Sequence, residues 1–379
     1  MDWLIPLGDI DFGVEEETAV LEVLRSRWLT LGAVTQAFEK DFAESVGSRH
    51  AIAVNNATAA LHLACLACGV GPGDEVIVPS LSFVATANAA RYTGATPVFA
   101  DITSEQDLTI SAQSIAACLT EKTRAIIVMH YGGYACDMPA ILAFAKQHGL
   151  AVIEDAAHAA GSSLEGRGLG SWGQAGCYSF FSNKNMTTGE GGMLVTDEDE
   201  IADKVRNLRS HGMTSMTWDR HKGHAWSYDV TALGYNYRID ELHSAIGRAQ
   251  LAKLARNNAR RAQAVARYQE LLAELAPSII VPFQSYRGVS SYHIFPILLP
   301  PGQDRLAFME SMKAQRIQTS IHYPPIHTFS AYAEMNASRK SSLPVTEEVA
   351  SREVTLPLYP GLSDADVLTV AQAAQKAMN

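Results

Sequence analysis

Lys184 lies in a segment whose residues give its amine a chemical role. The segment reads CYSFFSNKNMTTGEGG over residues 177–192, and an apolar run that ends in Glu154-Asp155 lies upstream, 29 residues before the lysine (184 − 155). A lysine amine can form a Schiff base with the aldehyde of pyridoxal 5′-phosphate (PLP). An aspartate at a strand end can pair with the pyridinium nitrogen and keep the ring an electron sink. The two residues together predict PLP chemistry, with Lys184 and Asp155 as catalytic residues.

A phosphate-binding helix start is predicted at residues 56–58. Asn56-Ala57-Thr58 follows a strand pattern that ends at Val54, and a helical pattern comes after it. A helix that begins directly after a strand offers backbone N–H donors to a phosphate, and Thr58 adds a hydroxyl. Ser179, which precedes the lysine, can add a second hydroxyl. Taken alone, Thr58 fits a helix cap equally well, and Ser179 fits a strand serine that bonds to the backbone.

Two further side chains near predicted strand ends can contact such a cofactor. Phe83 follows a strand pattern, and a flat ring there can stack on the pyridine; an aromatic residue in a sheet core is the alternative. His158 lies three residues beyond Asp155 and can reach the ring oxygen of the cofactor or hold the aspartate. A lone histidine is more often structural, so its role depends on where the fold places it.

Short β-branched runs alternate with helical patterns between residues 50 and 200, which predicts an α/β fold. Strands are expected at 50–54, 75–78, 97–100, 125–129 and 151–154, and helices at 57–69, 85–92 and 138–148. Continuous apolar strands that alternate with helices indicate a mostly parallel sheet covered on both faces. Ligands bind beyond the carboxyl ends of the strands in such sheets. Asp155 lies at such an end.

The pattern changes in the last third of the chain. A long helix is expected over 240–274, then a strand at 292–299, a helix at 304–314, a strand at 317–322 and a helix at 364–378. A chain of 379 residues exceeds the usual size of one hydrophobic core. We therefore expect a large cofactor-binding domain over residues 1–250 and a smaller C-terminal α+β domain over 251–379.

Composition indicates the class of protein and the cellular compartment. Apolar residues make up 47% of the chain and charged residues 18%, as in ordinary soluble proteins, and the formal net charge of −10 argues against a nucleic-acid or anionic-membrane surface. No apolar stretch approaches the length of a spanning helix, and the N-terminus has no signal-peptide pattern. The five cysteines are dispersed and odd in number, which predicts reduced thiols in a cytoplasm. Cys65 and Cys68 form a CxxC that we interpret as part of a buried helix face.

Together these features resemble the sugar aminotransferases of the DegT/DnrJ/EryC1/StrS family, within the fold type I group of PLP enzymes. The resemblance covers nearly the whole chain. It rests on the Lys184 segment and on WLTLG (28–32), NATAALH (56–62), GATPV (94–98), VMHYGG (128–133), EDAAHAAG (154–161), LRSHG (208–212), GYNYR (234–238) and HYPPIH (322–327).

The resemblance implies a role for each matching residue. Lys184 matches the lysine that binds PLP, Asp155 the pyridinium partner, and Phe83 the ring stacked on the cofactor. Ala57, Thr58 and Ser179 match the residues that bind the cofactor phosphate, and Asn236 matches a residue that reaches the phosphate of the partner subunit. The residues implied to contact the substrate are Thr30, Leu31, Gly32, His322, Tyr323 and His327. Thr30–Gly32 would line the neighbouring subunit's site, so the resemblance implies a homodimer with shared active sites.

Two segments differ from the family pattern. The loop Gly133-Tyr134-Ala135-Cys136-Asp137 lacks a glutamine that family members often carry, so the sugar does not follow from the resemblance. The insert at 213–229 is individual to this chain and carries Trp218, His221, His224 and Trp226. Its two histidines lack further cysteine or acidic ligands at useful spacing, and no metal site is predicted.

The implied reaction is ping-pong transamination from L-glutamate to a nucleotide-linked keto-sugar in amino-sugar biosynthesis. A 4-keto-6-deoxy or related 4-keto sugar is expected first; a C3 ketone and a cyclitol ketone remain alternatives. A family relative with histidine at the lysine position dehydrates sugars, whereas this chain has Lys184. The other classes are a catalytically idle PLP-binding regulator, against which the Lys184–Asp155 pair argues, and a PLP-dependent lyase or desulfurase. The latter needs a mobile reactive cysteine, and Cys177 lies in an apparent strand.

Overall fold

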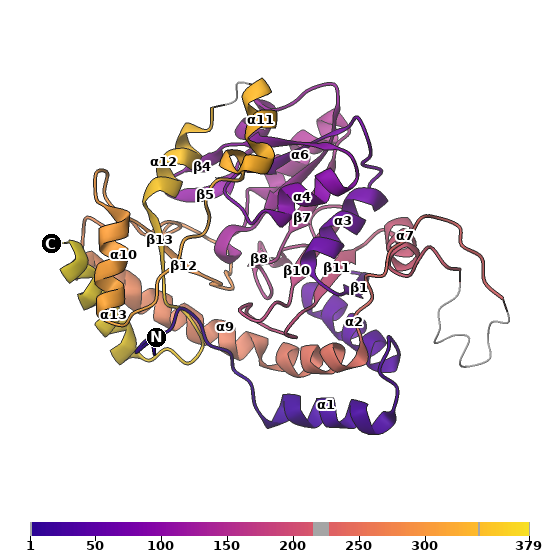
Figure 1. Ribbon diagram of the computed structural model, residues 1–379, viewed down its shortest axis with the longest axis horizontal. Coiled ribbons are helices and arrows are strands. Elements are labelled where there is room, and N and C mark those ends of the chain that lie inside the picture. The colour runs from indigo at the N-terminus through magenta and orange to yellow at the C-terminus, as the bar shows by residue number, and fades with distance from the viewer. Residues whose placement is uncertain (1, 215–226, 340–341, 379) are drawn as a thin grey trace.

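The computed structural model describes residues 2–214, 227–339 and 342–378 (Figure 1). The helices are α1 (Val14–Ser26), α2 (Ala33–Val46), α3 (Ala57–Ala67), α4 (Ala85–Tyr92), α5 (Ala112–Ala116), α6 (Met138–His148), α7 (Asp199–Arg209), α9 (Glu241–Leu275), α10 (Arg305–Ala314), α11 (Ser330–Arg339), α12 (Pro344–Arg352) and α13 (Asp364–Met378). Two single turns of 3-10 helix are η1 (Tyr131–Gly133) and η2 (Ile326–Thr328).

The central element is a seven-stranded mixed sheet. Its order is β1 (His50–Val54), β11 (Gly192–Thr196), β10 (Ala175–Ser179), β7 (Ala151–Asp155), β6 (Thr123–Met129), β2 (Glu75–Pro79) and β3 (Thr96–Ala100). Five of these strands, from β10 to β3, pair in parallel, and β11 is antiparallel to both of its neighbours. The predicted mostly parallel sheet of an α/β fold is therefore confirmed.

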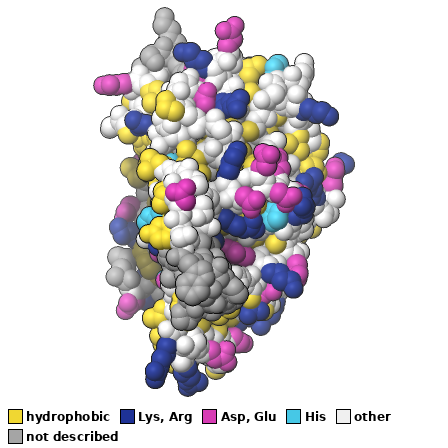
Figure 2. Space-filling view, turned by 90° about the vertical axis from the view of Figure 1, so that its right-hand side faces the viewer, with side chains coloured by type: hydrophobic (Ala, Val, Ile, Leu, Met, Phe, Trp, Pro, Cys, Tyr) yellow, Lys and Arg dark blue, Asp and Glu magenta, His cyan; other side chains and the backbone are white. Residues whose placement is uncertain are grey.

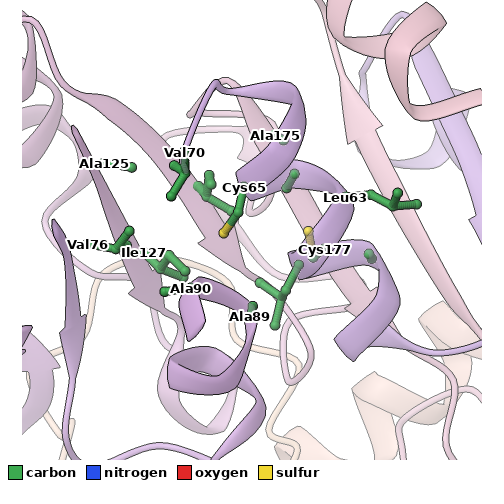
Figure 3. Close-up of a cluster of buried hydrophobic side chains, with 14 of the residues drawn as sticks. Leu63, Cys65, Val70, Val76, Ala89, Ala90, Ala125, Ile127, Ala175 and Cys177 are labelled. Carbon is green, nitrogen blue, oxygen red and sulfur yellow. The ribbon is translucent and has the colours of Figure 1, made fainter. Parts of the chain in front are cut away.

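Helices cover both faces of this sheet because successive strand residues point to opposite sides. On one side Val76 and Ile127 pack with α3, α4 and α7, and on the other side Ile77 and Ile126 pack with α5 and α6. Figure 3 shows the first of these clusters, in which Cys65 and Leu63 of α3 and Ala89 and Ala90 of α4 meet side chains of the strands. Full burial of one large aliphatic side chain contributes about 1.5–3 kcal/mol.

The C-terminal part forms a second cluster around a short sheet. Strands β12 (Phe295–Leu298) and β13 (Glu353–Leu356) pair antiparallel, and α10, α13 and the second half of α9 pack against them together with Ile5. Figure 1 shows α9 extending from the side of α1 and α2 to α13. The predicted domain boundary after residue 250 falls inside this continuous helix of 35 residues, so the division at that point stays a prediction.

Most predicted elements agree with the structure. The strand expected at 292–299 is shorter, with β12 covering only Phe295–Leu298, and two further elements differ. The expected strand at 317–322 is wrong: Ile317 and Ser320 form only isolated bridges, to Ile5 and Thr355. Each bridge is isolated and involves a different partner segment, so no ladder forms. The helix expected over 57–69 ends at Ala67, because Gly69 has a positive φ of 77° that closes the helix. Besides β12–β13, the described residues form two more two-stranded sheets. In these, β4 (Ile102–Ser104) pairs with β5 (Asp107–Ile110), and β8 (Ser163–Leu164) pairs with β9 (Arg167–Gly168).

The surface carries charges of both signs. On the face in Figure 2, Lys and Arg side chains lie among Asp and Glu side chains. Within the described ranges, no helix combines the length and apolar character needed to cross a bilayer.

A buried carboxylate on α9 caps the start of α2. The N-cap residue of α2 is Gly32, which has no side chain for this purpose. Glu241, at the start of α9, instead accepts hydrogen bonds from the backbone N–H groups of Gly32 (2.9 Å), Val34 (2.8 Å) and Thr35 (2.8 Å). The Thr35 hydroxyl donates a fourth bond at 2.6 Å. These contacts join two helices whose first residues are more than 200 positions apart, and they satisfy donors that the helix itself leaves unpaired.

Replacing this carboxylate should destabilise the protein. In Glu241→Gln the side-chain NH2 group takes the place of one carboxylate oxygen and faces a backbone N–H donor. At least one charged hydrogen bond is therefore lost without a substitute. We expect the free energy of unfolding to fall by about 2 kcal/mol. Urea denaturation followed by circular dichroism measures the change. The matched control is Glu270→Gln on the same helix, an exposed residue paired with Arg267, for which we expect a change below about 0.5 kcal/mol. Equal losses in both variants would contradict the capping role.

Candidate active site

A cavity of about 650 Å³ lies at the carboxyl ends of the strands. The ends of β6, β7 and β10 contribute Met129, Asp155 and Ser179 to its wall, and the loops after β1 and β2 contribute the segment 56–58 and Phe83. The C-terminal part adds His322 and Tyr323. The cavity thus brings together nine of the predicted site residues: Ala57, Thr58, Phe83, Asp155, His158, Ser179, Lys184, His322 and Tyr323.

Lys184 follows β10 and extends into this cavity. Its backbone N–H donates to the carbonyl of Phe181 (2.9 Å), and its side chain is half-buried. Burial lowers the pKa of the amine from 10.5 to about 8, while the nearby Asp155 carboxylate acts in the opposite direction. A lowered pKa leaves a larger share of the side chain as free amine near neutral pH, which is the form that attacks an aldehyde or accepts a proton.

Asp155 is buried at the end of β7 and is held by two donors. The Thr86 hydroxyl donates to Oδ2 at 2.7 Å, and the Ala157 backbone N–H donates to Oδ1 at 3.2 Å. Burial raises the pKa of this carboxyl, and these hydrogen bonds together with Lys184 oppose the rise. Both oxygens are therefore oriented before any ligand binds. Sequence reasoning missed Thr86, whose only signal was its position at the start of the helix after β2.

His158 is fixed as a neutral imidazole. The Gly132 N–H donates to Nδ1 at 3.3 Å, so the ring proton of the neutral form lies on Nε2. Nε2 lies 2.9 Å from the Tyr323 hydroxyl and donates to it. Burial lowers the pKa of His158 well below its usual value. Tyr323 can then direct its own hydroxyl proton toward a ligand.

His293 was missed by sequence reasoning and contacts the lysine directly. Its Nε2 lies 3.4 Å from Lys184 Nζ, and its Nδ1 lies 2.9 Å from Asn185 Oδ1. The Asn185 amide donates to Asn258 Oδ1 and the Ser291 carbonyl, so its own oxygen is the acceptor for His293 Nδ1–H. Nε2 of His293 is left with a lone pair toward the lysine amine. Within the sequence His293 appeared only as one position of a strand pattern.

The residues present fit the phosphate and the ring of PLP. Asn56 Oδ1 accepts from the Ala59 N–H (2.8 Å), and the preceding amides at the start of α3 have no partner within the helix. A Cβ at Gly192 would lie 2.5 Å from the Asn56 carbonyl carbon, so glycine is needed where β11 passes this helix start. Phe83 is 56% exposed, a flat apolar face open to the cavity. Donors for a phosphate, a face for a ring, a carboxylate and an amine are all present.

The other predicted site residues lie outside the cavity wall. Asn236 is exposed and forms an isolated backbone bridge with Ser210, and Thr30 is exposed at the start of α2. The single chain leaves their predicted contact with a neighbouring subunit untested. His327 is buried, with Nδ1 at 2.7 Å from Ser80 Oγ and Nε2 at 3.2 Å from Glu347, so these partners occupy both of its ring nitrogens.

Histidine and cysteine residues provide no metal site in the described part of the chain. Of the predicted insert, Trp218, His221, His224 and Trp226 lie outside the described residues. Cys177 is buried within β10 and burial raises its thiol pKa well above the usual value, which makes it a poor nucleophile. Of the CxxC interpreted as part of a buried helix face, Cys65 is buried in α3, whereas Cys68 is half-buried at the C-cap just after the helix.

Comparison with known proteins agrees with this geometry. The DegT/DnrJ/EryC1/StrS aminotransferase family matches residues 11–375. The spore coat polysaccharide biosynthesis protein SpsC of Bacillus subtilis (strain 168) is 42% identical over 368 residues, which are 96% of this chain and 94% of that protein.

Solved structures extend the similarity to the fold. DesV of S. venezuelae, in complex with a ketimine intermediate, has a TM-score of 0.91 and 34% identity over 99% of both chains. Helicobacter pylori PseC, an aminotransferase involved in the biosynthesis of pseudoaminic acid, has a TM-score of 0.89 and 29% identity over 100% of this chain and 99% of its own. The match over nearly the whole length and the lysine–aspartate cavity lead to one conclusion: the chain belongs to the DegT/DnrJ/EryC1/StrS family and is a PLP-dependent sugar aminotransferase.

Proposed function

We propose that this aminotransferase moves the amino group of L-glutamate to a ketone of a nucleotide-linked keto-sugar, with a 4-keto-6-deoxy or related 4-keto sugar as the acceptor. The observation that carries the proposal is the cavity in which a lysine amine of lowered pKa and an oriented aspartate lie together. Its volume of about 650 Å³ falls within the range of about 300–1,000 Å³ typical of small-molecule sites. A relative in spore coat polysaccharide synthesis supports a role in amino-sugar formation.

The proposed roles follow from the contacts of each side chain. When bound, PLP supplies an electron sink for the carbon that gains or loses the amino group. Asp155 holds the ring nitrogen, and Thr86 and Ala157 keep its carboxylate in place. Lys184 binds the cofactor and, as a free amine, takes the α-proton of the donor and returns it. His158 donates to Tyr323 and fixes the orientation of that hydroxyl in the cavity wall, where it would contact a bound substrate.

We also propose a homodimer with shared sites. The support is the exposure of Asn236 and Thr30, polar residues just before α9 and α2 that are not among the residues lining the cavity of their own chain. The five free cysteines support a cytoplasmic location, in line with the composition.

The acceptor is identified by a substrate panel. The enzyme is incubated with glutamate and nucleotide-linked 4-keto sugars, 3-keto sugars and a cyclitol ketone, and products are identified by mass spectrometry and NMR. We expect the fastest amination at C4 of a 6-deoxy sugar. Preferential amination of a 3-keto sugar or a cyclitol would contradict the proposed acceptor. Cofactor binding without any change of its visible absorption band on adding glutamate would indicate a regulator.

A covalent test concerns the lysine. Borohydride reduction of the holoenzyme followed by peptide mapping should place the pyridoxyl mass on Lys184. Lys184→Ala should lose transamination, because the anchor and the proton carrier are removed together. Lys204→Ala, which changes an exposed lysine of α7, serves as the control and should retain activity. A pyridoxyl mass on another lysine would overturn the assignment.

Removing the charge of Asp155 should slow the reaction strongly. In Asp155→Asn the shape is kept, but the ring nitrogen loses its anionic partner, and we expect kcat to fall on the order of 10²-fold or more. Stopped-flow absorbance of the glutamate half-reaction measures this step in the cofactor-loaded variant. The control is Asp203→Asn, whose carboxylate is exposed on α7. Near-normal turnover of the loaded Asp155→Asn enzyme would mean that the residue is misassigned.

Complementation tests the shared site. Lys184→Ala and Asn236→Asp chains, the acid chosen to repel phosphate, should each be inactive alone, and they are mixed under subunit exchange. If sites are shared, a mixed dimer contains one site with an intact Lys184 and an intact Asn236, and activity rises above both parents. If Asn236 acts within its own subunit, each site keeps one lesion and activity does not return.

A further inference from the structure

A chain of hydrogen bonds runs from the cavity wall to a fully buried carboxylate. His322 lines the cavity, and its Nδ1 lies 2.8 Å from the Thr355 hydroxyl. The same hydroxyl lies 2.6 Å from Glu353 Oε1, while Glu353 Oε2 accepts the backbone N–H of His322 at 2.8 Å. Glu353 is 0% exposed and Thr355 is 1% exposed. Glu353 and Thr355 lie on β13 and face the same side, because strand residues two apart share a face.

The position of the shared proton in this series of hydrogen bonds determines whether His322 Nε2 faces the cavity as a donor or as an acceptor. With Glu353 ionised, Thr355 donates to the carboxylate and must accept from His322 Nδ1–H, so Nε2 carries a lone pair. With Glu353 protonated on Oε1, the carboxyl donates to Thr355, which donates to Nδ1, so Nε2 carries the proton. The backbone bond from His322 to Oε2 is kept in both states. Among the described residues, only Thr355 is bonded to the His322 ring, which leaves Nε2 available to a ligand.

We propose that Glu353 and Thr355 are positioning residues for His322, and that the proton they share decides whether His322 donates a hydrogen bond to the keto-sugar or accepts one from it. The inference rests on the proposed function, because it assigns His322 to the sugar. His322 adjoins Tyr323, whose ring lies 6.1 Å from that of Phe83, the predicted ring-stacking residue. His322 thus joins the cavity wall from the C-terminal part, whereas the residues for PLP come from the strand ends and the loops that follow them.

The buried groups around Glu353 place the change of the His322 tautomer in an accessible pH range. Burial raises the pKa of Glu353 to about 8, opposed by the hydrogen bonds of Thr355 and His322 N–H and by the charge of Arg305. Arg305 also donates to the Glu353 backbone carbonyl at 3.4 Å. The hydroxyls of Tyr131 and Tyr323 also face Glu353; burial is the main cause of their raised pKa values, and the charge of Glu353 adds to it.

His322 itself stays uncharged over this range. Burial, and then the charge of Lys184, lower its pKa to about 4. The titration of Glu353 therefore exchanges one neutral tautomer of His322 for the other. Below about pH 8 Nε2–H donates, and above it Nε2 accepts. A ketone oxygen can only accept, so the protonated state of Glu353 favours the keto-sugar, and its binding should weaken as pH rises.

Nitrogen-15 NMR reads the tautomer directly. Full-length protein labelled with 15N-histidine is studied from pH 6 to pH 10, and His322→Gln identifies the His322 signals by their loss. In the wild type we expect the proton to move from Nε2 to Nδ1 with a midpoint near the pKa of Glu353. In Glu353→Gln the amide oxygen can still accept the His322 N–H and the amide N–H can donate to Thr355. This variant should keep the Nε2–H tautomer at every pH.

Two substitutions at Thr355 separate the relay from a general structural effect. Thr355→Ser keeps the hydroxyl and should keep the pH response of the His322 tautomer. Thr355→Val keeps the shape and should abolish that response. A wild-type tautomer that does not change with pH, or one that changes equally in Thr355→Val, overturns the proposal. If Thr355→Val does not fold, the comparison of the wild type with Glu353→Gln tests the proposal by itself.

Kinetics tests the assignment to the sugar. In the wild-type holoenzyme we expect KM for the keto-sugar to rise roughly tenfold between pH 7 and pH 9, the size of one lost hydrogen bond. In Glu353→Gln this rise should be absent. A difference between the two proteins that appears in KM for glutamate instead would mean that His322 faces the amino acid, which overturns the assignment. Failure of the proposed function itself looks different: no keto-sugar is aminated, whatever the tautomer does.

Discussion

The site depends on one constraint, which is that a carboxylate must be buried at the end of a central strand without being left unpaired. An isolated buried charge is very costly, so each oxygen needs a donor. Asp155 receives Thr86 and Ala157, and its neighbour Glu154, on the opposite face of β7, receives backbone N–H groups of residues 170, 172 and 173 and the ring of His130. Two adjacent acids are thus held on the two sides of one strand, which fixes the position of the residue that meets the cofactor.

Two buried histidines and the half-buried His322 lie near the lysine without adding charge. Burial lowers the pKa values of His158, His293 and His322, so each acts through the position of one proton. The partners Gly132 N–H, Asn185 Oδ1 and Thr355 Oγ1 select that position for each ring. The same low-polarity surroundings lower the pKa of Lys184. Burial at the cavity wall therefore prepares a reactive amine and a set of directed hydrogen bonds at once.

The cavity also depends on elements far apart in the chain. His322 and Tyr323 come from the C-terminal part, and their partners are on β13 and after β7. Helix α9 packs with α1 and α2 through its first half and with α13 through its second half, which joins the two clusters of buried side chains. Glu241 adds a polar link at the first of these contacts. Packing along this helix keeps the C-terminal residues beside the strand ends.

Local sequence determined the sheet strands, the helix starts and the chemistry of the main residues. Alternation of apolar strands and helices predicted the strand ends, and Lys184, Asp155, Thr58 and Ser179 then meet at one edge because parallel strands share their carboxyl side. Tertiary structure alone decided the partners: Thr86, His293 and Glu353 are, respectively, 69, 109 and 31 positions from the residues they hold. No local pattern encodes such pairs, because hydrogen-bond partners are chosen by packing between distant elements rather than by the spacing of neighbours along the chain.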